Sequence, residues 1–181
     1  VRRPSRSIAA FGAVGRPVDL AIVIIPARAV LAVLEDCAAV GVRHAIIISS
    51  GFAEEGGESV HAQAGIAALA KRTGMRISGP NAEGFYNAIA GVAATFSPTV
   101  DVRPGVTPLI ATRKRIGIVA QSGGIGFAIY NRAKALGIAL SYVISTGNEA
   151  DLGAGAFFDF MVTDKSTDVI LLFLEGIRDT D

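Results

Sequence analysis

Short apolar runs alternate with stretches of helical periodicity along almost the whole chain. Residues 18–25 are apolar and β-branched, as in a strand buried on both faces, and Pro26 ends this run. The next apolar residues, from Val30 to Val40, recur at helical spacing before Gly41. Because strands separated by helices form parallel sheets with right-handed crossovers, the pattern predicts an α/β fold.

The alternation occurs twice, which predicts two parallel-sheet three-layer units, with helices on both faces of each sheet. In the first unit we expect strands at residues 18–25, 44–48 and 75–78, and helices at 30–40 and 59–73. In the second we expect strands at 116–120, 140–145 and 169–174, and helices at 123–136 and 154–162. Proline and glycine interrupt the periodicity between residues 96 and 114, so the predicted domains are 1–110 and 111–181. The first strand of the leading unit is weak or missing, since only residues 8–11 offer one.

Charge and hydropathy exclude several classes of partner. With 17 Lys+Arg and 16 Asp+Glu, the net charge of +1 is too small to steer the chain onto nucleic acid. The longest apolar runs, at residues 20–27 and 169–174, are far shorter than the roughly 18 residues of a membrane span. Cys37, a single cysteine in an apolar helical pattern, predicts a buried thiol and a reducing compartment. We therefore expect a cytoplasmic protein without nucleic-acid or membrane partners. The start at Val1 and the end just after a strand pattern suggest a piece of a longer polypeptide.

Ligands of open parallel sheets bind beyond the carboxyl ends of the strands, so the turns that follow the strands are candidate sites. The first two turns are Pro26-Ala27 and the segment SSGFAE at residues 49–54. The third is GPNAEG at residues 79–84, where Asn81 offers an amide that both donates and accepts. Each turn is equally compatible with a structural role, and Asn81 with an Asx-turn.

The fourth turn, QSGGIG at residues 121–126, joins a buried strand to a long helix. Ser122 is suited to cap this helix, while the N–H groups of Gly123 and Gly124 and the helix dipole favour an anion such as phosphate. The glycine spacing differs from that of the dinucleotide-binding motif, and no lysine follows as in the Walker phosphate loop. The alternatives are a phosphate or carboxylate site and an ordinary capped helix.

A carboxylate and two histidines complete the list of candidates. Glu175 follows the last strand, where ionisation needs a cationic or imidazole partner nearby, and a salt bridge to Arg178 is the alternative. The polar turn at residues 145–151 also follows a strand and either closes the same site or is a simple loop. His44 and His61 lack the surroundings of a nucleophile or metal ligand, so no metal site is expected.

Six separated stretches of the chain together carry a resemblance to a known family. They are, in order, IPA (residues 25–27), SSGF with Glu54 (49–54), GPNAEGFYN (79–87), GIVAQSGG (117–124), STGNEAD (145–151) and LEGIRD (174–179). They resemble the NDP-forming acyl-CoA synthetase superfamily, which includes the α subunit of succinyl-CoA ligase and ADP-forming acetyl-CoA synthetase. The resemblance extends over nearly the whole chain.

The resemblance implies a role for each unit. Residues 1–110 would form a Rossmann-like CoA-binding domain, truncated at its amino terminus, and residues 111–181 a flavodoxin-like ligase domain. It also implies that Ser122, Gly123 and Gly124 hold the phosphate of a phosphohistidine, and that catalytic Glu175 pairs with that histidine. The residues implied to lie near CoA are Pro26, Ala27, Ser50, Gly51, Phe52 and Asn81.

In this family, a small carboxylic acid, CoA and ATP or GTP yield an acyl-CoA through an acyl phosphate and a phosphohistidine. The resemblance implies that this histidine lies outside the chain, so that the isolated chain is inactive. It implies an ATP-grasp domain or subunit as partner, an oligomer, and ATP or ADP with Mg2+ only in the complete enzyme. The alternatives are a non-catalytic CoA-sensing module, as in some acetyltransferases, and a dinucleotide-binding redox or sensor domain.

Overall fold

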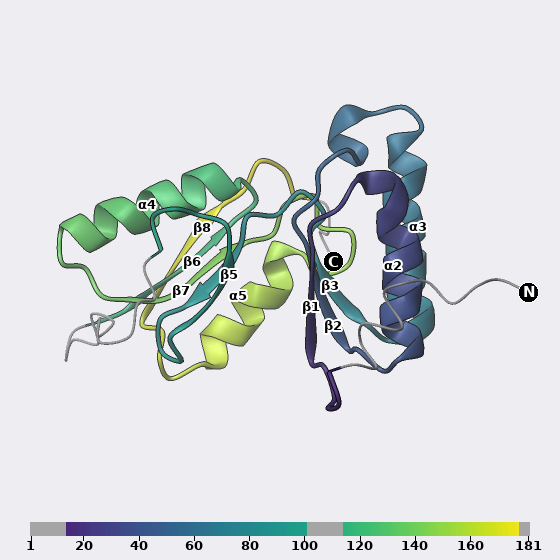
Figure 1. The fold of residues 1–181 in the computed structure, drawn as a ribbon. Coiled ribbons are helices and arrows are strands. Elements are labelled where there is room, and N and C mark those ends of the chain that lie inside the picture. Colours follow the sequence, from purple (N-terminus) through teal and green to yellow (C-terminus); the bar gives the residue numbers. More distant parts are fainter. Residues whose placement is uncertain (1–13, 101–113, 178–181) are drawn as a thin grey trace, which may run out of the picture.

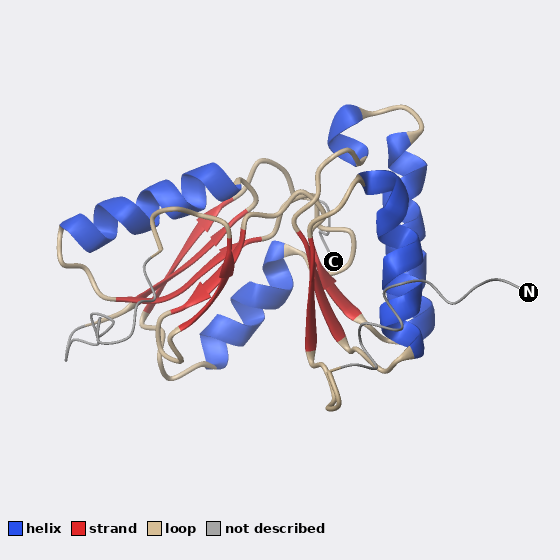
Figure 2. Ribbon diagram, viewed as in Figure 1, coloured by secondary structure: helices blue, strands red, loops and turns tan. Residues whose placement is uncertain are grey.

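The chain folds into two separate β-sheets, each with helices packed against it (Figures 1 and 2). The computed structural model describes residues 14–100 and 114–177. The carboxyl ends of the strands that lead into helices point toward the region between the two sheets (Figure 1). No helix in the described ranges is long and apolar enough to cross a membrane.

Within the described residues, sheet A contains three parallel strands in the order β1-β2-β3. These strands are β1 (Leu20–Val23), β2 (His44–Ile47) and β3 (Arg76–Ser78). The helices α2 (Ala27–Ala39) and α3 (Ser59–Thr73) pack beside each other on one face of the sheet (Figure 1). Gly74, in the left-handed conformation, ends α3 with a backbone hydrogen bond to Ala70.

The core of the first unit consists of apolar side chains that recur at helical spacing on α2 and α3 and face the buried positions of the strands. Among the most deeply buried are Val30, Leu34, Cys37, Ile47, Ile66 and Ile77. Burial, followed by the nearby Asp36 carboxylate, raises the pKa of the Cys37 thiol. The predicted buried thiol is therefore confirmed.

Sheet B contains five strands in the order β5-β4-β7-β6-β8. Its parallel part consists of β6 (Ile116–Ala120), β7 (Leu140–Ser145) and β8 (Val169–Phe173). The helix α4 (Gly123–Ala135) covers one face and α5 (Ala154–Thr163) the other (Figure 1). Every residue of the central strand β7 is buried. Sheet B is therefore a three-layer unit, whereas the described helices of the first unit lie on one face of sheet A.

A hairpin that the sequence did not predict completes sheet B. The strands β4 (Gly84–Asn87) and β5 (Val92–Thr95) pair antiparallel with each other, and β4 also pairs antiparallel with β7. The side chain of Asn87 accepts hydrogen bonds from two backbone N–H groups in the turn between the strands. Tyr86 of β4 packs edge-on against Tyr130 of α4, with ring centroids 5.5 Å apart. The chain therefore passes from sheet A to sheet B between Ser78 and Gly84.

The α/β fold class is confirmed, with sheet A parallel and sheet B mostly parallel. All ten predicted helices and strands are present, and α3, β6 and β7 have the predicted bounds. The predicted domain boundary at residue 110 and the weak strand at residues 8–11 lie outside the described residues. The domain division stays a prediction.

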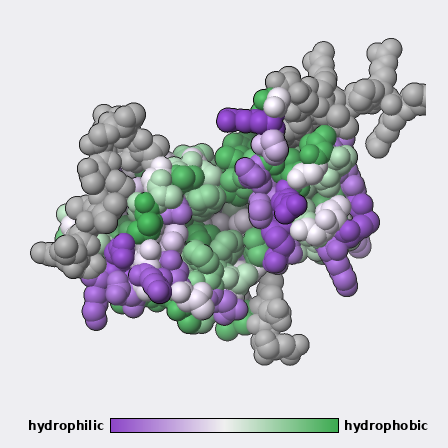
Figure 3. Space-filling model, turned by 90° about the horizontal axis from the view of Figure 1, so that it is seen from below, coloured by the Kyte–Doolittle hydropathy of each residue, from purple (hydrophilic) through white to green (hydrophobic). Residues whose placement is uncertain are grey.

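The helix α5 leaves part of its apolar surface exposed. Phe158 is 38%, Phe160 49% and Val162 60% exposed. Seen from below, hydrophobic side chains gather near the middle of the molecule, the region in which α5 lies (Figures 1 and 3).

Candidate functional site

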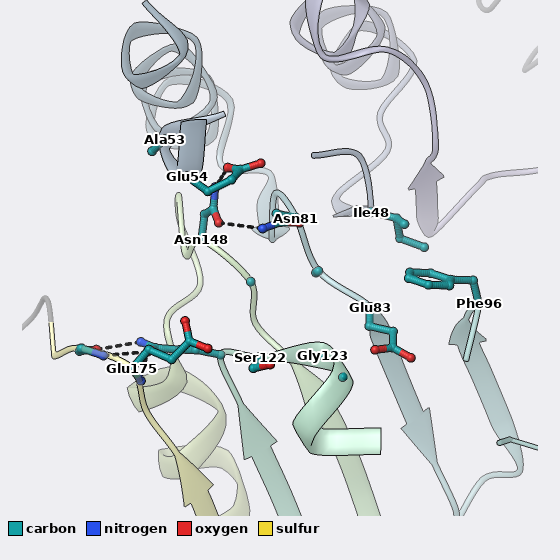
Figure 4. A pocket seen from close by; sticks show the side chains of 15 residues that line it. Ile48, Ala53, Glu54, Asn81, Glu83, Phe96, Ser122, Gly123, Asn148 and Glu175 are labelled. Atoms are coloured by element: carbon teal, nitrogen blue, oxygen red, sulfur yellow. Dashed lines mark hydrogen bonds between the residues drawn. The ribbon is translucent and has the colours of Figure 1, made fainter. Parts of the chain in front are cut away.

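A cavity of about 550 Å3 lies between the two sheets, at the carboxyl ends of their strands. The first unit lines it with the exits of β2 and β3, and the second unit lines it with the exits of β6, β7 and β8 (Figure 4). The side chains and backbone that line it belong to Ile48, Ala53, Glu54, Asn81, Ala82, Glu83, Phe96, Gln121, Ser122, Gly123, Gly124, Gly147, Asn148, Glu175 and Gly176. This is the position at which open parallel sheets bind their ligands.

Asn148, in the turn after β7, connects the two units on one side of the cavity (Figure 4). Its side-chain amide donates hydrogen bonds to Oε1 of Gln63 at 3.0 Å and to the carboxylate of Glu54. Gln63 returns a hydrogen bond to the Asn148 carbonyl oxygen at 3.2 Å, and Asn81 donates to Oδ1 of Asn148 at 3.4 Å. Both Asn148 and Gln63 are buried, so their hydrogen bonds replace those that water would otherwise make.

The backbone around Asn148 also runs close to the turn after β3. The N–H group of Asn148 donates to the Pro80 carbonyl oxygen at 2.8 Å, and that of Ala150 donates to Gly79 at 2.9 Å. Gly147 has a φ of 61°, and a Cβ atom there would lie 2.3 Å from the Pro80 carbonyl oxygen. Only glycine therefore fits between the two turns.

Glu54, in the short 3-10 helix η1 (Ala53–Glu55), holds the turn after β2. Its Oε1 accepts a hydrogen bond from the Gly51 N–H group at 2.7 Å, and its Oε2 accepts one from Asn148. Burial alone would raise the pKa of Glu54, but hydrogen bonds from Asn148 and from the backbone of this turn hold it below its ordinary value of 4.5. The ionised carboxylate is therefore the favoured form at neutral pH.

The helix α4 begins at Gly123, with Ser122 at the N-cap position. The Ser122 side chain makes no capping hydrogen bond, so the predicted side-chain cap is wrong. Glu83 lies directly against the first turn, because a Cβ atom on Gly123 would be 2.8 Å from Oε2 of Glu83. The amino terminus of α4 faces the cavity without a side-chain cap, as a phosphate-binding helix end requires.

Three carboxylates, those of Glu54, Glu83 and Glu175, line the cavity. Among the described residues that line it, none is a lysine, arginine or histidine. An anion bound here would depend on backbone N–H groups and the α4 dipole, and a cationic partner would have to come from another part of the protein. Within residues 14–100 and 114–177, no cluster of three or more His, Cys, Asp or Glu residues is suited to a metal ion.

The cavity brings together half of the residues that the sequence singled out. The predicted residues that line it are Asn81, Ser122, Gly123, Gly124 and Glu175. The five others lie outside the lining, between β1 and the first residue of α2 or in the turn after β2, and are Pro26, Ala27, Ser50, Gly51 and Phe52. The two turns touch, because a Cβ on Gly51 would lie 3.2 Å from the Ala27 Cβ. Phe52 as a whole is only 1% exposed, because its side chain packs in the core of the first unit.

Several residues that shape the cavity were not predicted as site residues. The motifs quoted above contain three of them, Glu83, Gln121 and Asn148. Each lies near a glycine at a strand exit, and this position could have marked it as a site residue. The two histidines do not line the cavity. His44 begins β2, and its Nδ1 lies 3.0 Å from the Asp19 carbonyl oxygen, while His61 is exposed on α3. Arg178, the alternative partner of Glu175, lies outside the described residues.

Comparisons with known proteins identify the family of both units. Residues 4–88 match the family described as CoA binding domain, and residues 113–181 match the one described as succinyl-CoA ligase like flavodoxin domain. The α subunit of the ADP-forming acetate–CoA ligase I of Pyrococcus furiosus is 40% identical to this chain over 162 residues. The chain belongs to the NDP-forming acyl-CoA synthetase superfamily. The resemblance on which the sequence interpretation rested is therefore confirmed.

Members of this superfamily with different acid substrates are similar to the chain. The apo form of the dinucleotide forming acetyl-coenzyme A synthetase 1 of Ca. Korarchaeum cryptofilum superposes with a TM-score of 0.80 and is 34% identical, over 92% of this chain and 34% of that chain. The ADP-forming 4-hydroxybutyrate–CoA ligase of Nitrosopumilus maritimus is 32% identical over 92% of this chain and 23% of that protein. The match to the Pyrococcus subunit covers 90% of this chain and 33% of the subunit. The chain thus spans about a third of the length of that relative.

Proposed function

We propose that this chain is the part of an NDP-forming acid–CoA ligase in which CoA, the acid and the phosphoryl group meet. The observation that carries the proposal is the cavity between the two sheets. It joins Asn81 of the first unit to the start of α4 and to Glu175 of the second unit. In the reaction we propose, a carboxylic acid, CoA and ATP or GTP give acyl-CoA, the nucleoside diphosphate and phosphate.

CoA would lie along the carboxyl edge of sheet A. The touching turns carry the small residues Ala27 and Gly51, and Ser50 is exposed beside them, so this edge has room for an extended ligand. In our proposal Pro26, Ala27, Ser50, Gly51, Phe52 and Asn81 contact CoA. The thiol end would reach the cavity past Asn81, which lines it.

The amino terminus of α4 would hold the phosphoryl group. Gly123 and Gly124 line the cavity at the start of this helix, which has no side-chain cap, and the N–H groups of a helix amino terminus are preorganised donors that stabilise a dianion. Glu175 would pair with a histidine that carries the phosphoryl group. Because His44 and His61 lie away from the cavity, we propose that another segment or subunit supplies that histidine.

The proposed steps conserve phosphoryl groups and electron pairs. The P–N bond of the phosphohistidine breaks as a carboxylate oxygen of the acid takes the phosphoryl group, which gives an acyl phosphate. The CoA sulfur then bonds to the acyl carbon, the bond from that carbon to the phosphate oxygen breaks, and the thiol proton passes to water or to the departing phosphate. The residues of this chain orient both partners and keep the phosphoryl group on the α4 amides.

The complete protein would contain more than this chain. We propose an ATP-grasp domain or subunit that binds ATP or ADP with Mg2+ and phosphorylates the histidine, in an oligomer located in the cytoplasm. Within the chain, we propose that residues 1–110 form the CoA-binding domain and contribute the hairpin of β4 and β5 to sheet B, and that residues 111–181 form the ligase domain. The isolated chain would not complete the reaction.

The test uses the full-length protein with its nucleotide-binding partner. The protein is mixed with CoA, ATP or GTP and a panel of acids that includes acetate and 4-hydroxybutyrate, and thioester and nucleoside diphosphate are measured. Formation of a CoA thioester supports the proposal. CoA binding without thioester from any acid supports the CoA-sensing alternative, and calorimetric binding of NADH in place of CoA supports the dinucleotide alternative.

A matched pair of variants tests the role of Glu175. Glu175→Gln removes the charge that would pair with the histidine, so acid-labile labelling from γ-labelled ATP should fall. Glu35→Gln removes an exposed carboxylate on α2, paired with Arg72 and far from the cavity, and should leave labelling unchanged. Equal labelling of both variants would reject the role proposed for Glu175.

A further inference from the structure

Gln121 is the last residue before the phosphate-binding turn, and its side chain reaches the turn after β8. The side-chain oxygen Oε1 accepts hydrogen bonds from the N–H groups of Glu175 at 2.6 Å and Gly176 at 3.0 Å. The side-chain nitrogen Nε2 donates to the Gly176 carbonyl oxygen at 2.8 Å. One amide thus binds the backbone of this turn through both its donor and its acceptor.

The same nitrogen also donates to a carboxylate that organises the turn after β7. Nε2 of Gln121 lies 3.1 Å from Oε2 of Glu149. The other oxygen of Glu149 accepts from Oγ1 of Thr146 at 2.7 Å and from the Ala154 N–H group, the first of α5, at 3.0 Å. Glu149 holds a left-handed backbone conformation, with φ of 58°. The exits of β6, β7 and β8 are therefore joined through one side chain.

The backbone of Gln121 is fixed as well. Its N–H group donates to the Phe173 carbonyl oxygen at 3.0 Å, as part of the pairing that continues from β6 and β8. The adjacent residues Ser122, Gly123 and Gly124 begin α4 and line the cavity. The side chain of Gln121 consequently sets the distance between the start of α4 and the backbone that carries Glu175.

We propose that Gln121 is a positioning residue, which holds the Glu175 carboxylate in register with the phosphoryl site at the start of α4. The proposal rests on the function proposed above, because it assumes that Glu175 acts on a phosphoryl-carrying histidine. A side chain of similar size without an amide would leave both turns intact but uncoupled. Misplacement of a reacting group by about 1 Å costs roughly 100-fold in rate, so this coupling affects turnover more than CoA binding.

Two substitutions in the full-length protein separate the acceptor and donor roles of the amide. Gln121→Met removes both. Gln121→Glu keeps the acceptor, but its ionised carboxylate faces the oxygens of Glu149 and Gly176. Asn131→Met replaces an exposed amide on α4 and is the control for replacing an amide side chain with a thioether.

For Gln121→Met we expect kcat to fall roughly 10- to 100-fold while the KM for CoA stays within about twofold. For Gln121→Glu we expect activity relative to the unmodified protein to rise as the pH is lowered from about 8 to about 6. The negative charge of Glu149 favours protonation of the new carboxyl group, and the protonated group can again donate a hydrogen bond to Glu149 or Gly176. Asn131→Met should match the unmodified protein. A Gln121→Met variant with unchanged kcat, or a Gln121→Glu ratio that stays flat with pH, would overturn the proposal.

Amide hydrogen exchange gives a readout that does not require turnover. The Glu175 and Gly176 amides should exchange faster in Gln121→Met than in the unmodified protein or in Gln121→Glu, which retains their acceptor. Equal exchange in all three proteins would reject the positioning role even if activity changed. Absence of ligase activity in the unmodified protein would instead reject the proposed function, and the exchange rates would still decide whether Gln121 fixes this turn.

Discussion

Two adjacent glycines at the start of α4 differ sharply in the space around them. A Cβ atom on Gly123 would lie 2.4 Å from Cβ and 2.8 Å from Oε2 of Glu83, and 3.1 Å from Oγ of Ser145. A Cβ atom on Gly124 would meet nothing within 4 Å. Because carbon atoms pack at about 3.5–4.0 Å, Gly123→Ala requires Glu83 or α4 to move by more than 1 Å.

Glu83 is poorly placed to move away. Its N–H group donates to Oγ of Ser145 at 2.9 Å, and its carbonyl oxygen accepts from Oγ1 of Thr95 at 2.6 Å. We therefore expect Gly123→Ala to lower the free energy of unfolding by about 1–3 kcal/mol, the range for overpacked sites. Gly124→Ala should leave it unchanged or raise it by up to about 1 kcal/mol, since alanine is the better helix former.

Urea denaturation followed by circular dichroism measures this difference, since the chain contains no tryptophan for fluorescence. With a slope of about 2 kcal/mol per molar urea, a 2 kcal/mol difference separates the midpoints of the two variants by about 1 M. The Glu83→Gly background removes the crowding carbon and should reduce the cost of Gly123→Ala. Equal midpoints for the two alanine variants, or an unchanged cost in that background, would refute this reasoning.

Three further predictions test other parts of the structure. Gly147→Ala should lower the free energy of unfolding more than Gly123→Ala does. The new Cβ would collide with the Pro80 carbonyl oxygen, and alanine rarely adopts the positive φ of this position. Urea denaturation of both variants measures the difference. Glu54→Gln should lower the free energy of unfolding at pH 7. Because the pKa of Glu54 is lowered in the folded state, the ionised carboxylate stabilises the fold above its ordinary pKa of 4.5, and this stabilisation is lost as the pH falls through the folded-state pKa. Denaturation from pH 7 to pH 3 therefore tests whether the difference in stability between the variant and the unmodified protein shrinks in acid. Leu34→Ala, at a fully buried position of α2, should cost about 2–5 kcal/mol, and a smaller loss in calorimetric unfolding would contradict the tight packing of that core.

The sequence predicted the helices with a clear apolar period and the strands that form apolar runs. The helix α3 has 15 residues, about four turns, and ends at Gly74. The strand β6 is an apolar run, and β7 is mostly apolar between Gly137 and Gly147, so the bounds of all three elements were predicted correctly. The strands β4 and β5 have only four residues each, and the first of them follows a turn with glycine and proline, so the same reasoning predicted no strand there. Their formation depends on pairing with β7, more than 50 residues later, which no local pattern reveals.

The sequence predicted the type and place of the candidate site, but only some of the residues that line it. Strand exits with glycine pointed to Asn81 and to the start of α4, and the cavity contains them. Contacts such as Gln63 with Asn148, 85 residues apart, arise from the packing of one unit against the other, and no spacing in the sequence encodes them. The residue type at the N-cap position suggested a capping hydroxyl, but the Ser122 side chain makes no capping hydrogen bond, and its residue type alone does not determine that outcome.

The hairpin of β4 and β5 imposes an order on folding during synthesis. All three strands of sheet A have been made by Ser78, whereas Gly84 pairs with Ser145, which the ribosome adds 145 − 84 = 61 residues later. At about 5–20 residues per second, Gly84 waits roughly 3 to 12 s for Ser145. During that interval the edge of β4 is open to pairing with other nascent chains. The first unit is thus free to fold while the second is still being made, and a pause in translation between residues 88 and 140 would lengthen the period of exposure.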